Sequence, residues 1–170
     1  MNIEKNTLEF VAVSLEFCTL METEGSHTLL SFTNRALKIL PLLYLHAIFL
    51  PEPEERDEDD EPEFFITEET YEVVRGRIAE LLGIHDMYLE TFHPDMPYSD
   101  TPIAATISEN LADVYQDIGN FVALFRQENE EVREQALYIC KENFRLYWGQ
   151  KALNALKALH DIRYNQNRTE

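Results

Sequence analysis

The sequence predicts an all-α protein: a single bundle-like domain of about six helices spanning residues 1–170. Apolar residues recur at intervals of three and four along most of the chain, the spacing of helices that bury one face. With only 5 glycines and 7 prolines, tight turns are few, which argues against a sheet-rich fold. The length suits one domain, and 45% hydrophobic with 27% charged residues is typical of globular proteins.

The first two helices are expected between residues 7 and 50, where apolar residues are dense. Asn6 is expected to cap the first helix and Gly25 to end it. Ser26 is expected to open the second helix, which should kink or restart at Pro41 because proline lacks a backbone N–H. The second segment is apolar nearly all the way round, so we expect it to be the most buried helix.

An acidic segment, residues 52–63, separates the second helix from the third. It contains nine acidic residues and one arginine, a local charge of −8 in a chain whose formal net charge is −18. Like charges repel one another and the two prolines oppose regular structure, so we predict a disordered linker in solvent. The remaining charge of −10 is spread over the folded part of the chain.

The third helix is predicted to start after Thr67, whose side chain can cap it, and to end at Gly83. The two glutamates that follow Thr67 fall in the first turn, where the helix dipole favours acidic side chains. Residues 84–105 contain three prolines and no sustained periodicity. We predict a long ordered loop or a pair of turns there, with a short extended piece at 88–92, and loops of this length are often functional.

Two more helical regions are predicted in the C-terminal third of the chain. Thr106 and Glu109 form a capping-box pattern, and Asn129 is expected to open the last region. On a continuous helix, the apolar residues that follow Gly149 would point almost opposite to those before it. Either the helix breaks at Gly149, which we favour, or one long helix lies between two partners. Residues 161–170 are expected to fray.

Composition excludes several classes of partner. A strongly acidic chain repels nucleic acids and anionic membranes, so neither is an expected partner. The longest apolar stretch, residues 37–50, is too short to cross a membrane, and the N-terminus lacks a secretory signal pattern. Cys18 and Cys140 are interpreted as reduced thiols in the core, which fits a cytoplasmic location.

No complete metal or cofactor motif is present in the sequence, so we predict neither a metal nor a cofactor. The only Glu-x-x-His, at Glu90 and His93, has no second copy, whereas helical di-iron sites need two. His85, Asp86 and Asp95 lie near this pair, but the spacing of the five residues matches no zinc or calcium pattern. These residues are therefore interpreted as surface groups of the long loop.

Asp113 and Asp117 stand one helical turn apart and could share a cation. On a helical wheel, however, Asp113 lies away from the apolar arc and Asp117 only flanks it. We therefore expect both carboxylates on a solvated face of the helix. His160 stands at the edge of an apolar run, where histidines are more often partly packed than bound to a metal, and Trp148 is expected in the core or an interface.

Several short blocks occur in an order shared with a known family: residues 17–18, 40–44, 50–51, 86–88, 92–94, 111–118, 147–149 and 155–160. On these blocks, the chain resembles an uncharacterised all-helical bacterial family, domain of unknown function 5063, from residue 8 to residue 160. The resemblance implies a helical domain and transfers no established activity. The shared blocks contain polar and aromatic residues that packing does not obviously explain. The resemblance therefore implies five candidate binding positions: Asp113, Tyr115, Asp117, Trp148 and His160.

The leading functional hypothesis is a cytoplasmic protein-interaction or adaptor module whose partner is another protein. It rests on the missing catalytic constellation and on broad apolar faces that could leave a groove. The alternative is a metal-dependent helical hydrolase acting on a small phosphorylated or amide substrate through Asp113, Asp117 and His160. A third possibility is a nucleic-acid mimic that uses the acidic surface of the protein, to which residues 52–63 contribute. Cation binding would distinguish the hydrolase, and deletion of the acidic segment would test the mimic.

Overall fold

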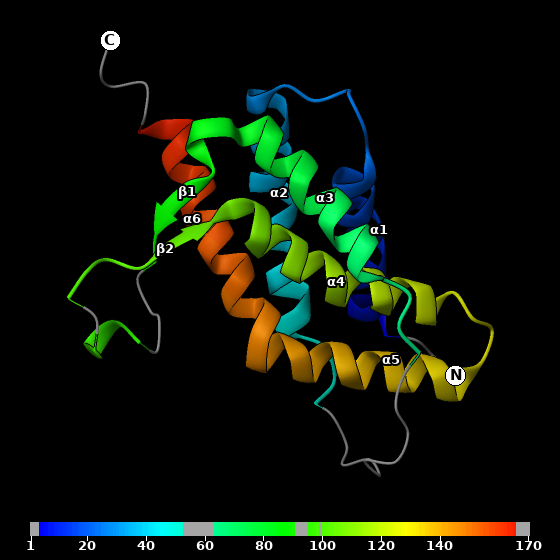
Figure 1. Ribbon diagram of the computed structural model, residues 1–170. Helices are drawn as coiled ribbons and strands as arrows, with labels where there is room; N and C mark the ends of the chain where they lie inside the picture. The colour runs from blue at the N-terminus through cyan, green and yellow to red at the C-terminus, as the bar shows by residue number, and fades with distance from the viewer. Residues whose placement is uncertain (1–3, 53–62, 91–94, 99, 166–170) are drawn as a thin grey trace.

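Helix α4 forms the centre of the molecule, and four other helices pack against it. The computed structural model describes residues 4–52, 63–90, 95–98 and 100–165. The main helices are α1 (Lys5–Glu22), α2 (Leu29–Ile48), α3 (Glu68–Leu82), α4 (Ile107–Phe125), α5 (Glu130–Asn143) and α6 (Gly149–Tyr164), as Figure 1 shows. The prediction of a mostly helical single domain is confirmed.

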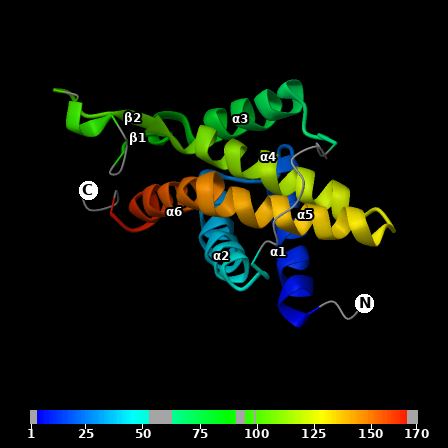
Figure 2. The same ribbon diagram turned by 90° about the horizontal axis from the view of Figure 1, so that it is seen from below.

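The helices are layered around α4, which contacts α1, α3, α5 and α6. Seen from below, α3 and α2 lie on opposite sides of α4 (Figure 2). Helix α2 packs instead on α1 and α6, at the edge of the bundle. Thirteen of the 19 residues of α4 are buried, against seven of 20 in α2. The expectation that the second helix is the most buried was therefore wrong, because α2 has neighbours on only part of its circumference.

The N-terminal boundaries of α1 and α2 differ from those predicted. Asn6 lies inside α1, where its amide contacts His46 on α2: Nδ2 donates to the carbonyl at 3.1 Å, and Oδ1 lies 2.8 Å from Nδ1. Helix α2 starts at Leu29, and Thr28 caps it in a capping box with Ser31. This tertiary contact of Asn6 and the longer loop before α2 are not encoded in local spacing.

Pro41 does not break α2, which runs through it without interruption. The proline is exposed, so water can solvate the backbone groups that lose a hydrogen bond there. Helix α3, in contrast, begins and ends as predicted. Thr67 accepts a hydrogen bond from the backbone N–H of Thr70, and Gly83 ends the helix with φ +55°, a conformation that favours glycine.

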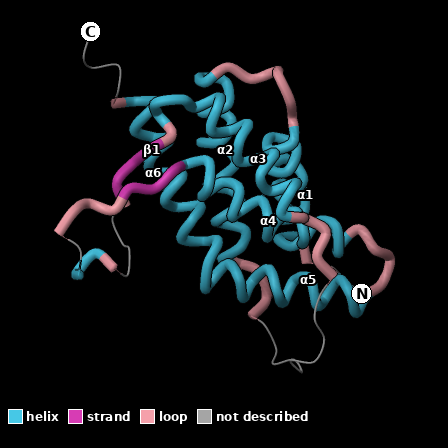
Figure 3. The backbone as a smooth tube through the Cα atoms, in the orientation of Figure 1, coloured by secondary structure: helices cyan, strands magenta, loops and turns pink. Residues whose placement is uncertain are grey.

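The predicted long loop contains a small two-stranded ribbon. Strands β1 (Met87–Leu89) and β2 (Ala104–Thr106) pair antiparallel, with Tyr88 opposite Ala105 (Figure 3). Short 3-10 turns stand at Gly83–His85 and Met96–Tyr98. Turns and an extended piece were expected in this segment, but the pairing of the extended piece with a second strand was not predicted.

Asp86 joins this ribbon to the start of α4. Its carboxylate accepts hydrogen bonds from the backbone N–H of Ser108 at 2.8 Å and from the Ser108 hydroxyl at 2.6 Å. Acidic side chains are favoured at this end of a helix because its first N–H groups have no helical acceptor. The interpretation of Asp86 as a surface group was therefore wrong: it is buried and caps α4.

Helices α5 and α6 are joined by a π-helical turn, Phe144–Trp148, and the favoured break at Gly149 is not observed. Gly149 donates its N–H to the Phe144 carbonyl five residues earlier. The Trp148 indole N–H donates to the Cys140 carbonyl at 3.0 Å from a fully buried ring. The wider turn reorients the apolar face, so α5 packs on α4 while α6 packs on both α2 and α4.

The remaining predictions concern the cysteines, the chain end and the acidic segment. Cys18 and Cys140 are free and buried. Helix α6 continues to Tyr164, so fraying from residue 161 was wrong, and residues 166–170 lie outside the described part. Residues 53–62, most of the predicted linker, also lie outside it. Within the described residues, no helix is both long and apolar enough to span a bilayer.

Candidate functional site

Asp113 lies where α3, α4, the π turn and α6 meet. The Tyr71 hydroxyl on α3 donates a hydrogen bond of 2.7 Å to Asp113 Oδ1. Lys151 Nζ on α6 lies 3.8 Å from Oδ2, and Tyr147 of the π turn lies close enough for Asp113 to raise the pKa of its hydroxyl. The side chain of Asp113 is only 14% exposed. The expectation of a solvated face was therefore wrong, since the neighbouring helices cover this side of α4.

Asp117 follows one turn later on α4 and is also mostly enclosed. Its Oδ1 accepts a hydrogen bond of 2.8 Å from the side-chain amide of Asn143 on α5. Burial raises the pKa of the Asp117 carboxyl to about 6; the hydrogen bond from Asn143 opposes this rise, and the nearby charge of Asp113 adds to it. A cavity of about 30 Å³ borders Asp117 and Phe64, room for one or two water molecules.

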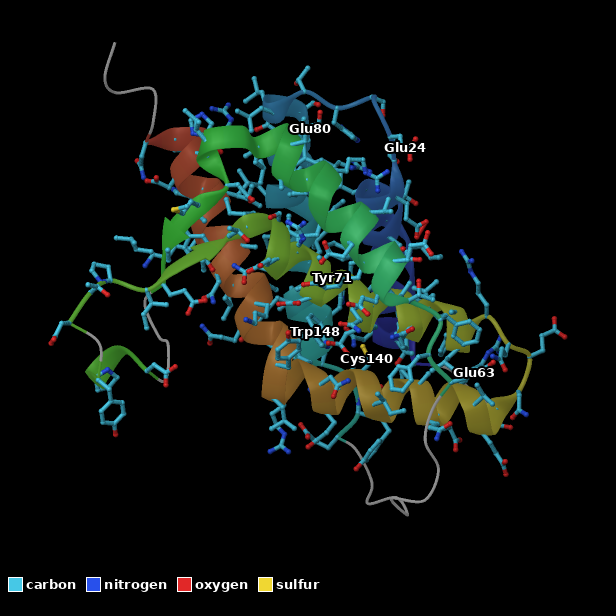
Figure 4. The ribbon with its side chains drawn as sticks, in the orientation of Figure 1. Glu24, Glu63, Tyr71, Glu80, Cys140 and Trp148 are labelled. Carbon is cyan, nitrogen blue, oxygen red and sulfur yellow. The ribbon has the colours of Figure 1, made fainter. Side chains whose placement is uncertain are left out.

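The hydroxyls of Tyr71 and Tyr147 are both perturbed by Asp113. Burial, reinforced by Asp113, raises the pKa of Tyr147 to about 12 and that of Tyr71 further above its ordinary value. Both hydroxyls therefore stay protonated near neutral pH. Figure 4 labels Tyr71 on α3, with Trp148 and Cys140 at the junction of α5 and α6. Asp117, with its raised pKa, therefore lies beside the ion pair of Asp113 and Lys151. The Asp113 carboxylate already has hydrogen-bond and charge partners within the protein.

The other predicted site residues lie elsewhere. The Tyr115 hydroxyl donates to Glu22 Oε1 on α1 at 3.1 Å. Trp148 is core, with its ring 6.4 Å from that of Phe10. His160 is exposed and packs on Tyr164, with ring centroids 4.7 Å apart. The structure thus brings Asp113 and Asp117 together but adds none of the other three to them.

A metal-binding constellation is not found in the described residues, where no three His, Cys, Asp or Glu side chains converge suitably. The Asp113–Asp117 pair has Asn143, two tyrosines and a lysine around it instead. The Lys151 ammonium already neutralises the negative charge that would otherwise attract a metal ion to Asp113. This chemistry favours a structural polar cluster over a cation site.

Lys141 is a buried charge that sequence reasoning missed. Its Nζ donates to the carbonyls of Ala47 and Ile48 at 2.9 and 2.8 Å, at the C-terminal end of α2. A cation is favoured there because the last helical carbonyls lack donors and carry the negative end of the dipole. A lysine in the last turn of α5 is a sequence signal for a contact with helix carbonyls. The carbonyls that Lys141 binds, however, lie over 90 residues earlier in the chain, so the sequence does not identify them.

A regular stripe of side chains lies on the solvent side of α2. Arg35, Lys38, Leu42, Leu45 and Phe49 follow one another at intervals of three, four, three and four, with Phe49 directly after the helix end. All five are exposed, and the three apolar ones are 45%, 46% and 62% exposed. We call these five residues the α2 outer stripe. Their heptad spacing is that of a seam between two packed helices.

Comparison with known proteins places the chain in a family. The family described as Domain of unknown function (DUF5063) matches residues 1–165. The chain belongs to the DUF5063 family. A solved structure similar to this DUF5063 chain is that of protein BF1032 from Bacteroides fragilis, with 43% sequence identity, a TM-score of 0.85 and 98% of each chain covered. A search of curated proteins found no match.

Membership of DUF5063 confirms the resemblance drawn from the sequence blocks and the helical fold that it implied. The family carries no assigned activity, so function has to be argued from the geometry of this chain. The two features available for that argument are the Asp113–Asp117 cluster and the α2 outer stripe.

Proposed function

We propose that this DUF5063 protein is a protein-interaction module that binds an amphipathic helix of a partner protein along the α2 outer stripe. The observation that carries the proposal is the exposure of Leu42, Leu45 and Phe49 at heptad spacing on one side of a well-formed helix. Apolar side chains gathered on one surface are typical of interaction sites, whereas single ones are not informative.

The energetics favour a helical occupant. Fully burying an exposed leucine or phenylalanine stabilises a complex by roughly 1.5–3 kcal/mol, and these side chains are already about half buried. The three apolar residues would thus contribute a few kcal/mol together. Two helices packed along a heptad seam cover such a row continuously, because each side chain fits between residues of the facing helix.

Charge selects the kind of helix. The sequence of α2 contains no acidic residue, although the chain carries a net charge of −18, and Arg35 and Lys38 occupy the N-terminal half of the stripe. Arg35 lies 3.6 Å from Glu16, but both side chains are more than half exposed, so this pair is weak. A partner helix would therefore carry apolar residues opposite Leu42, Leu45 and Phe49 and acidic residues opposite the two basic ones.

A second copy of the same stripe meets these requirements poorly. Antiparallel pairing of two α2 helices would set the basic end of one stripe against the apolar end of the other. Parallel pairing would set like charges side by side, which is unfavourable. The charge pattern therefore favours a different protein as the partner.

A designed peptide tests the proposal. We would titrate the full chain with a helical peptide that carries leucines at heptad spacing and glutamates opposite Arg35 and Lys38. Saturable binding is expected, and Leu45→Glu should weaken it at least tenfold. Leu153→Glu, at a leucine of α6 that is 39% exposed, is the matched control and should leave binding unchanged. Equal binding by the two variants, or by a peptide with lysines in place of the glutamates, would contradict the proposal.

The alternative of a metal-dependent hydrolase rests on Asp113 and Asp117. The raised pKa of Asp117 favours acid–base chemistry, but His160 lies on the surface beside Tyr164 and Asp113 is bound to Tyr71. This alternative requires one divalent cation per chain, bound in calorimetry and lost in Asp117→Asn. A lack of heat with magnesium, manganese, zinc and iron would end it.

A further inference from the structure

A cavity of about 390 Å³ lies at the end of the molecule where α2 begins and α6 ends. The turn after α3 lies at the same end (Figure 1). None of the described residues that line it is acidic, in a chain with 32 acids. The lining residues are Thr28, Leu29, Leu30, Thr33, His85, Ile162 and Arg163. This volume falls in the range of small-molecule sites, and its walls combine apolar and positively polarised groups.

Thr33 is the feature that packing does not explain. It borders the cavity and is 0% exposed, and its hydroxyl has no hydrogen-bond partner in the described structure. A buried hydroxyl without a partner is costly, so such groups are rare unless a ligand or water satisfies them. Thr33 follows Leu29 by four positions, so the two residues lie on the same face of α2, and both border the cavity.

The first turn of α2 supplies further donors. The capping box uses the backbone N–H groups of Thr28 and Ser31. The N–H groups of Leu29 and Leu30 have no carbonyl acceptor within the helix, because they precede the first helical hydrogen bond. Together with the positive end of the helix dipole, these two amides favour an anion.

Arg163 brings a full positive charge to the same place. Its Nε donates to Asn34 Oδ1 at 2.8 Å, which fixes the guanidinium beside the start of α2. The guanidinium presents its donors in a planar fork that suits phosphate and carboxylate oxygens. His85, from the turn after α3, also lines the cavity.

We infer that this cavity binds a small soluble phosphate monoester. The phosphate would accept hydrogen bonds from the amides of Leu29 and Leu30, from Arg163 and from Thr33, and its apolar body would lie against Ile162. A neighbouring cavity of about 200 Å³ shares His85 and Ile162 and gives the body room. The overall negative charge of the protein opposes approach to anionic lipid, so a soluble ester is favoured over a phospholipid headgroup.

The test is a titration of the ¹⁵N-labelled full chain with phenyl phosphate, followed by NMR. Saturable shifts are expected at the amides of Leu29 and Leu30 and at Arg163 Nε, and phenol, which lacks the phosphate, should not produce them. Arg163→Gln should weaken binding by about tenfold or more, because it removes charge-assisted hydrogen bonds. Thr33→Val keeps the shape without the hydroxyl and should weaken binding several-fold without lowering stability.

Arg145→Gln is the matched control, since Arg145 is an exposed arginine of the π turn that pairs with Glu142 of α5. It should bind phenyl phosphate as the unaltered chain does. Dissociation constants within twofold of each other for the chain, Arg163→Gln and Thr33→Val would overturn the inference. So would shifts confined to residues outside the cavity, or binding only to vesicles that contain phosphatidic acid. None of these outcomes bears on the α2 outer stripe.

Discussion

The Tyr71 hydroxyl and the Asp113 carboxylate, 42 positions apart, are joined by a hydrogen bond of 2.7 Å that links α3 to the central helix. Lys151 and Tyr147 contact the same carboxylate from α6 and the π turn. Asp113 therefore ties three elements to α4 through one side chain. The consequences of this polar cluster for stability can be measured.

Tyr71→Phe is expected to lower the free energy of unfolding by about 1–3 kcal/mol, because it leaves a shielded carboxylate oxygen without its donor. Urea unfolding followed by circular dichroism measures this change. Tyr98→Phe is the control, since Tyr98 is 89% exposed and its substitution should have little effect. Equal stability of the two variants would show that the bond between Tyr71 and Asp113 contributes nothing to the fold.

The pH dependence of stability should reveal Asp117. Its carboxyl has a pKa of about 6 in the folded chain against 3.8 for the ordinary group, so the folded state holds this proton more tightly. The Asp117 contribution to stability is therefore most favourable below about pH 4 and declines as the pH rises toward 6. Asp117→Asn removes this penalty and should be more stable than the unaltered chain at pH 7.5, by about 1–3 kcal/mol.

The measurement is urea unfolding of both proteins between pH 4 and pH 7.5. The difference between them should be small at pH 4 and grow through pH 6. Asp161→Asn, on an exposed side chain of α6, should show no such trend. A difference that stays constant with pH would mean that the burial of Asp117 does not perturb its titration.

Gly149→Ala should be strongly destabilising. A Cβ at this position would lie 2.6 Å from the Phe144 carbonyl oxygen and 2.9 Å from the Phe144 ring, so the π turn would have to shift. Such overpacking costs about 1–3 kcal/mol. Gly76→Ala is the matched control in α3, where nothing lies within 4 Å, and should stabilise by about 0.5–1 kcal/mol. Thermal unfolding of both variants tests the pair, and effects of the same sign would contradict it.

Lys141→Met is expected to loosen the C-terminal end of α2. The substitution keeps the apolar stem but removes the two hydrogen bonds to Ala47 and Ile48, at a cost of about 1–3 kcal/mol. Hydrogen exchange should accelerate in the last turn of α2. Lys157→Met, at an exposed position of α6, should leave exchange there unchanged, and protection retained in Lys141→Met would refute this role.

Local chemistry accounts for what the sequence predicts well. The limits of α3 follow from Thr67 and Gly83, because a cap and a positive-φ glycine act within one turn. Apolar spacing gives the helices themselves, and with them the fold class. Asn6, in contrast, looks like a cap and instead contacts His46, 40 positions away, which no local pattern encodes.

The candidate site was predictable only as a pair of residues. Asp113 and Asp117 are brought together by helical spacing alone, but their burial depends on Tyr71, Asn143 and Lys151 from other elements. The helical wheel of α4 contains none of these neighbours. The α2 outer stripe was missed for the opposite reason: a helix apolar all round indicates burial, and only the packing reveals which side is left uncovered.

The π turn also sets where the length of this chain can change. The hydrogen bond of a π turn joins residues five positions apart, whereas that of an α-helix joins residues four positions apart. The π turn therefore contains one more residue than a regular helical turn. We expect removal of a solvent-facing residue such as Arg145 to yield an unbroken α-helix that keeps the orientation of both flanking segments. Loss of a single residue during evolution is therefore expected to be tolerated at this junction, whereas inside another helix it would rotate the following turns out of register.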